Sequence, residues 1–180
     1  MENLSRRNFV VTGTTQMGGL ALGNRIFGGW ADGLRQPVKV YGTLEILIGV
    51  YAFLFPAFDR LTNHIFILTG SPMVEHAGWL LLLKGLLSAG LLLGPTILMG
   101  GTLPLLAAWL QKFSADAGRR SARLYSVNSL GAVTGAALAG FWLVQHLGMI
   151  ATLQITATAN VVIGMTAILL SQGGGLIRQI

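Results

Sequence analysis

The stretch AGWLLLLKGLLSAGLLLGPTILMGGTLPLLAAW, residues 77–109, contains a single charged residue, Lys84, and is otherwise mostly leucine, glycine and alanine. An α-helix rises about 1.5 Å per residue, so about 20 apolar residues cross the hydrocarbon core of a bilayer. This stretch is longer than that. We therefore expect a membrane-spanning helix here, surrounded by lipid and not by water.

The composition of the whole chain supports the same conclusion. Of its 180 residues, 53% are hydrophobic and 10% are charged, and the mean hydropathy is +0.67, whereas soluble domains carry about 25% charged residues. The chain has no cysteine, which excludes disulfides, thiolate metal sites and cysteine nucleophiles. The net charge of +6 comes from cations placed between apolar runs, so it indicates membrane orientation and not nucleic acid binding.

Four further apolar stretches predict an all-α, multi-pass transmembrane bundle that forms one integral membrane domain over residues 1–180. Gly94-Pro95 predicts a kink in the long third span, and two short helices with a re-entrant turn are the alternative. We expect residues 57–76 to lie along the interface, and a tight turn at Gly148. The expected spans, about five in number, are residues 9–30, 39–56, 77–109, 124–147 and 149–170.

The placement of lysine and arginine predicts the orientation of these spans. Cytoplasmic loops are enriched in both residues. We therefore expect the loops 31–38 and 111–123 and the tail from Ser171 on the cytoplasmic side of a bacterial inner membrane. The cations on that side are Arg35, Lys39, Lys112, Arg119, Arg120, Arg123 and Arg178.

The N-terminus carries a competing signal. The sequence Ser5-Arg6-Arg7-Asn8-Phe9-Val10 resembles a twin-arginine export signal, which would hold the N-terminus inside and reverse every later helix. That reversal would place Arg119 and its neighbours outside, against the charge count.

Small residues recur at helical spacing in several of the expected spans. Helices in lipid associate through close backbone approach at such residues, so these stripes predict packing faces. A path for solute is the alternative interpretation. The stripes are Gly19-x-x-x-Gly23, Gly131-x-x-x-Gly135-x-x-x-Ala139 and Asn160-x-x-x-Gly164.

Three polar residues are expected at similar depth inside the bilayer. Arg25, Glu45 and Asn128 would form one cluster, either a network that fixes helix register or a binding or proton-coupling site. Lys84 is expected to extend its side chain outward to the interface. The histidines His64, His76 and His146 are expected to be solvated near the outer boundary, with axial ligation of a haem or pigment as the alternative.

Several segments together resemble a known family. Residues 19–37 (GLALGNRIFGGWADGLRQP) are similar to the cytoplasmic loop signature of major-facilitator-type transporters, with Asp32 at its acidic position, Gly33 where a basic residue is usual, and Arg35 following. Combined with residues 41–56, 91–106 and 118–143, the chain resembles the N-terminal membrane half of fused transporter/spermidine-synthase-like proteins, in the same order.

That resemblance implies a membrane domain without the first helix and without the aminopropyltransferase domain of the family. Gly173-Gly174-Gly175 has no strand before it and no acid after it, so it does not predict a nucleotide-binding turn.

From these features we expect a non-enzymatic accessory or scaffold subunit of a larger membrane assembly. Its partners would be the lipid bilayer and other membrane subunits, with no cofactor, no metal and no nucleic acid. Transport or sensing of a small cation such as a polyamine, with Glu45 as counter-ion, is an alternative. A membrane anchor for a separate spermidine-synthase-like enzyme is another.

Overall fold

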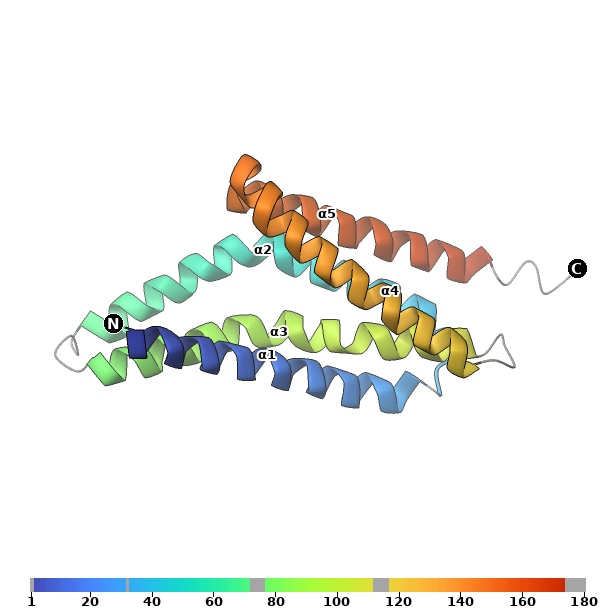
Figure 1. Cartoon of the computed structure of the whole chain (residues 1–180), viewed down its shortest axis with the longest axis horizontal. Coiled ribbons are helices and arrows are strands. Elements are labelled where there is room, and N and C mark those ends of the chain that lie inside the picture. The colour runs from blue at the N-terminus through green and yellow to red at the C-terminus, as the bar shows by residue number, and fades with distance from the viewer. Residues whose placement is uncertain (1, 32, 72–76, 112–116, 174–180) are drawn as a thin grey trace, which may run out of the picture.

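The computed structural model describes residues 2–31, 33–71, 77–111 and 117–173, and their side chains from Thr14 to Gln172 except for Ala117. Every element in these ranges is helical, as the sequence predicts (Figure 1). The elements are α1 (Glu2–Ala31), α2 (Pro37–Gly70), α3 (Ala77–Gln111), α4 (Ala117–Leu138), the π-helical turn η2 (Ala139–Leu143) and α5 (Val144–Gly173).

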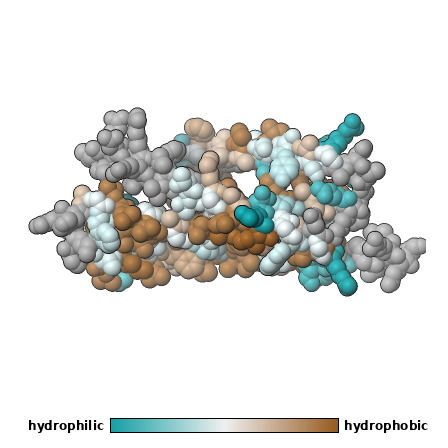
Figure 2. Space-filling model, turned by 90° about the horizontal axis from the view of Figure 1, so that it is seen from below, coloured by the Kyte–Doolittle hydropathy of each residue, from teal (hydrophilic) through white to brown (hydrophobic). Residues whose placement is uncertain are grey.

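Three helical segments are long and apolar enough to cross a membrane: Pro37–Gly70, Ala77–Gln111 and Gly118–Gln172. Large apolar side chains lie exposed along them, among them Leu86 at 63% and Leu170 at 70% exposure. Figure 2 shows such side chains over much of one face. Contact of this much apolar surface with water is unfavourable. The three segments therefore indicate an integral membrane protein.

Length and hydropathy do not support the expected count of about five spans. Helix α1 is helical over Glu2–Ala31 but is not among the three segments, and the last two expected spans belong to one helical segment. That segment reverses direction at Gly148, where φ is 78° and ψ is 170° (Figure 1). A positive φ suits glycine because it has no Cβ.

Helix α2 is longer than the sequence suggested. It runs through Pro56 to Gly70, so residues 57–70 are helical. The prediction of an interfacial loop from residue 57 onward is therefore wrong for these residues. Polar side chains beyond the proline bond within the helix: Thr62 Oγ1 donates to Phe58 O at 2.8 Å and Arg60 Nε to Pro56 O at 3.2 Å. Figure 1 shows α2 bent along its length, as a proline inside a helix permits.

Helix α3 does not show the kink expected at Gly94-Pro95. It is one continuous, nearly straight helix in Figure 1, so the re-entrant alternative does not apply either. Pro95 has no N–H to donate to the carbonyl of Leu91, one turn earlier. The hydroxyl of Tyr51 on α2 donates to that carbonyl at 2.5 Å. A bond between helices thus replaces the missing bond within the helix.

Helices α1 and α3 pack side by side through small residues. A Cβ on Gly23 would collide with the backbone of Ile97, and one on Gly100 would collide with the backbone of Leu20. Gly19 lies in the same way against the Thr96 side chain, whose hydroxyl bonds to Leu92 O at 2.8 Å. The two backbones touch because neither has a side chain between them, which is how helices associate in lipid.

Helices α2 and α5 use the same device. A Cβ on Gly42 would lie 2.6 Å from Gly164 O, and one on Gly49 would lie 2.8 Å from Ala157 O. Next to this crossing is a small buried cluster that joins α1, α2 and α3 and consists of Ala31, Leu44, Leu105 and Ala108.

Substitution of Gly23 by leucine should prevent the α1–α3 contact. Because the new side chain meets backbone that cannot move aside, we expect Gly23→Leu to lower the free energy of unfolding by at least about 2 kcal/mol. Unfolding in mixed detergent micelles, followed by circular dichroism, measures this. Gly131→Leu is the matched control because no atom lies within 4 Å of its Cβ position. Equal destabilisation by the two variants would contradict the conclusion that Gly23 lies in the contact between α1 and α3.

Removal of the Tyr51 hydroxyl should destabilise the protein only while residue 95 is proline. We expect Tyr51→Phe to cost about 1–3 kcal/mol, because it leaves Leu91 O without a donor in an apolar medium. On a Pro95→Ala background the helix supplies its own N–H, and the same substitution should cost less than about 0.5 kcal/mol. The same unfolding assay tests this, with Tyr125→Phe on exposed α4 as the control. An equal loss of stability from Tyr51→Phe with proline or alanine at position 95 would show that the Tyr51 hydroxyl does not replace the missing N–H of Pro95.

Candidate functional site: a transmembrane helix without packing partners

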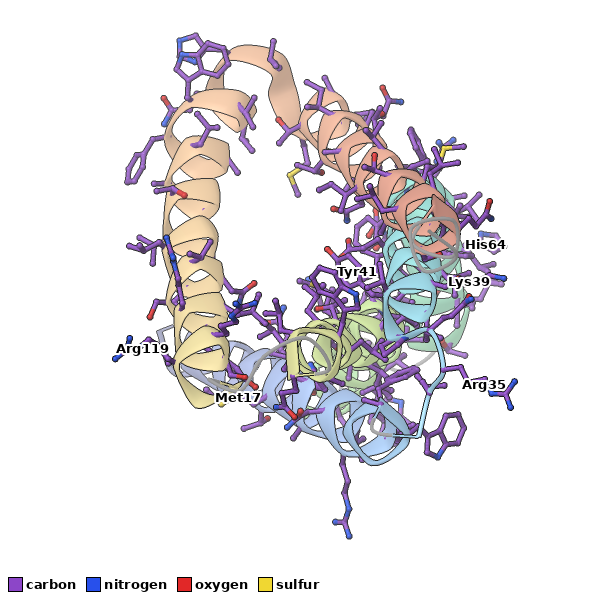
Figure 3. The ribbon with its side chains drawn as sticks, turned by 90° about the vertical axis from the view of Figure 1, so that its right-hand side faces the viewer. Met17, Arg35, Lys39, Tyr41, His64 and Arg119 are labelled. Atoms are coloured by element: carbon purple, nitrogen blue, oxygen red, sulfur yellow. The ribbon has the colours of Figure 1, made fainter. Side chains whose placement is uncertain are left out.

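Helix α4 is the least packed described helix. Between Gly118 and Leu138 every residue is exposed except Ser121 and Leu124, which are half-buried. It contacts α3 through a few residues and continues into η2, but does not pack along α5. Figure 3 shows α4 standing apart from α5 across an open space. Almost the whole surface of α4 is therefore available to lipid or to another helix.

The small-residue stripe of α4 is also uncovered. Gly131 and Gly135 have no atom within 4 Å of their Cβ positions, and Ala139 is half-buried in the π-helical turn. By contrast, Gly19 and Gly23 lie against α3, and Gly164 lies against Gly42. Among the described residues, the α4 stripe is thus the one with no opposing helix.

The polar groups of α4 divide into satisfied and unsatisfied ones. Thr134 Oγ1 donates to Leu130 O at 2.9 Å and Ser126 Oγ to Ala122 O at 3.0 Å, so these hydroxyls bond within their own helix. The amide of Asn128 is exposed on the same helix. At about 100° per residue, Asn128, Gly131, Gly135 and Leu138 share one face. An amide in hydrocarbon gains from an interhelical hydrogen bond.

Glu45 lies half-buried on α2. Tyr41, one turn earlier, forms a side-chain hydrogen bond with it, and Figure 3 shows Tyr41 directed toward the space between the helices. Gly42 and Gly49 on the same helix form the close contact with α5. The carboxyl group of Glu45 therefore lies on the part of α2 that packs closely against α5.

The structure does not bring Arg25, Glu45 and Asn128 together. Arg25 is exposed on α1, which packs mainly along α3 and meets α2 only near its end, where Ala31 joins the cluster that contains Leu44. Asn128 is on the separate helix α4. The expected cluster was inferred from similar depth in the bilayer, and the glycine contacts pair α1 with α3 and α2 with α5.

The remaining predicted residues are scattered. Arg35 is exposed in the α1–α2 connection, which begins with Gly33 N donating to Trp30 O at 3.1 Å. Asp32 and His76 lie outside the described residues. Lys84 and His64 are exposed, and His146 stacks on Trp142 near the α4–α5 reversal, with ring centroids 5.2 Å apart. The described residues contain no group of three His, Cys, Asp or Glu side chains that could hold a metal ion.

An open hollow of about 220 Å³ lies between α2 and α3, beside the Tyr51–Leu91 hydrogen bond. The polar side-chain groups of its lining are the Tyr51 phenol, which donates to Leu91 O, and the Thr62 hydroxyl, which donates to Phe58 O. It therefore suits a lipid tail better than a reaction. The lining residues are Tyr51, Phe58, Leu61, Thr62, Ile65, Gly90 and Leu91.

No protein-family model, curated protein or solved structure matches the chain. The resemblance to transporter/synthase fusion proteins therefore stays a prediction from sequence, and the assignment of function depends on the residues themselves.

Proposed function

We propose that this chain is a non-enzymatic subunit of a larger assembly in a bacterial inner membrane, and that α4 is the helix through which it docks onto another transmembrane segment. The contrast among the small-residue stripes carries this proposal. Those of α1, α2 and α5 are covered by other helices of the chain, whereas the stripe of α4 is open. The exposed amide of Asn128 on the same face gives an approaching helix a hydrogen-bond partner.

Within this proposal all five long helices cross the membrane. Helix α1 is too polar to be identified as a membrane span by its composition. It packs along α3, so it would lie at the same depth in the bilayer as α3. Helices α4 and α5 are separated by the reversal at Gly148 and form two passes. The end that carries Arg35 and Arg119 would face the cell interior.

Photocrosslinking from α4 in native membranes tests the docking role. A photoreactive amino acid at Asn128 or Leu138 should give one discrete protein adduct, because both positions lie on the stripe face. At Val133, which is 69% exposed but about 200° around the helix from Gly131, it should give lipid adducts only. Mass spectrometry of the adducts is the measurement.

The double variant Gly131→Leu/Gly135→Leu completes this test. It should abolish the protein adduct while leaving helicity and unfolding unchanged, because nothing lies within 4 Å of either position. Identical adducts from all three labelled positions would contradict the proposal. An adduct of twice the chain mass would show a homo-oligomer and so contradict the accessory role.

A small-cation site at Glu45 is a second candidate, favoured by a half-buried carboxyl group that interacts with Tyr41 on the same helix. It predicts that Glu45→Gln abolishes binding of radiolabelled spermidine to proteoliposomes while unfolding and abundance stay unchanged, because only the counter-charge is lost. Glu45→Asp should retain measurable binding. If Glu45 is purely structural, Glu45→Gln would lower abundance, and the wild-type protein would bind no spermidine.

A further inference from the structure

Exposed cations gather at one end of the molecule, where α1 and α3 end and α2 and α4 begin (Figure 1). Figure 3 looks onto this end and shows Arg35 and Lys39 on one side of it and Arg119 on the other. In a membrane, this end lies at the level of the lipid headgroups on one side. The exposed cations among the described residues there are Arg25, Arg35, Lys39, Arg119, Arg120 and Arg123.

The densest part of this charge is in the first two turns of α4. Arg119, Arg120 and Arg123 are all exposed, and the helix from Ala117 to Leu138 contains no acidic residue. The positive end of a helix dipole disfavours nearby cations. The arginines therefore gain from any anion that comes between them.

Beyond the arginines this helix face carries Ser126, whose hydroxyl donates to Ala122 O of the same helix, and then the apolar residue Leu130. At about 100° per residue, Arg119, Arg123 and Leu130 lie within about 40° of one another around α4. Leu130 is 67% exposed, and Figure 3 shows Arg119 on the outer side of α4. Positive charge is thus followed by apolar surface along one line that runs from the interface into the bilayer.

We propose that this face of α4 binds an anionic phospholipid, with the headgroup phosphate on Arg119 and Arg123 and the acyl chains along the helix. A soluble phosphate or a nucleic acid would match only the arginines, whereas a phospholipid matches both parts in the right order. The stripe of Gly131 and Gly135 lies about 80–160° away from Arg119 and Arg123. The lipid and a docked helix therefore occupy different faces, and the lipid site does not depend on the proposed function.

The opposite end of the molecule differs. Arg60 is exposed there, but its Nε donates to Pro56 O of its own helix at 3.2 Å, and Asp59 is its neighbour in the chain. Arg60 is an exposed arginine that already donates to a carbonyl of its own helix, so it is the control for the arginines of α4.

The test uses the absence of cysteine from the chain. A Leu130→Cys variant carrying a bimane fluorophore is reconstituted in phosphatidylcholine vesicles, and quenching by brominated phosphatidylglycerol is compared with quenching by brominated phosphatidylcholine. We expect the anionic lipid to be preferred by about fivefold per arginine, the equivalent of about 1 kcal/mol each.

Substitutions at the arginines show whether the lipid preference depends on their positive charge or on the structure of the helix. Arg119→Gln/Arg123→Gln should bring the preference close to one, whereas Arg119→Lys/Arg123→Lys and Arg60→Gln should keep most of it. If the double glutamine variant does not insert, Arg123→Gln alone should still reduce the preference about fivefold. Equal quenching by both lipids in the otherwise unchanged protein would overturn the proposal. Loss of the preference on addition of inorganic phosphate would also overturn it, by showing a site for a free anion.

Discussion

The whole structure depends on contact between bare helix backbones. In hydrocarbon, burial of apolar side chains gives helices little reason to associate, because lipid tails are equally apolar. What remains is dispersion and close approach, and both require positions without side chains. Gly23 against Ile97 and Gly100 against Leu20 meet this need for α1 and α3, and Gly42 against Gly164 meets it for α2 and α5. These crossings decide which helices are neighbours, and so which polar groups can meet.

The same lack of water explains how prolines are tolerated. Each proline inside a helix removes a donor, and a free carbonyl in hydrocarbon costs several kcal/mol. Tyr51 supplies the donor for Leu91 O, so α3 stays straight at Pro95 and is joined to α2 at the same point. The hydroxyl groups of Thr152, Thr158 and Thr166 on α5 bond to carbonyls one turn earlier and so satisfy their own polarity within the helix. These polar side chains are therefore engaged with the backbone.

Hydropathy was sufficient to predict an all-helical membrane chain, because it depends only on composition and length. It was not sufficient for the kink, since the carbonyl left without a donor by Pro95 bonds to Tyr51, which is distant in sequence. The Arg25–Glu45–Asn128 cluster was predicted from equal depth, and the three residues lie on three different helices, because depth alone does not decide which helices face one another. Small-residue spacing identified Gly19 and Gly23, but it could not distinguish them from Gly131 and Gly135, which no other described helix approaches.

The contrast between α4 and the other helices has a thermodynamic consequence. Helices α1, α2, α3 and α5 lose contacts with one another if the bundle opens, whereas α4 is joined through a few residues of α3 and the reversal at Gly148. Movement of α4 within the membrane plane therefore costs little internal energy. A helix that costs little to move is positioned by whatever binds it. Under the two proposals made above, the position of α4 would be set by a helix that covers Gly131 and Gly135 and by a lipid that neutralises Arg119 and Arg123.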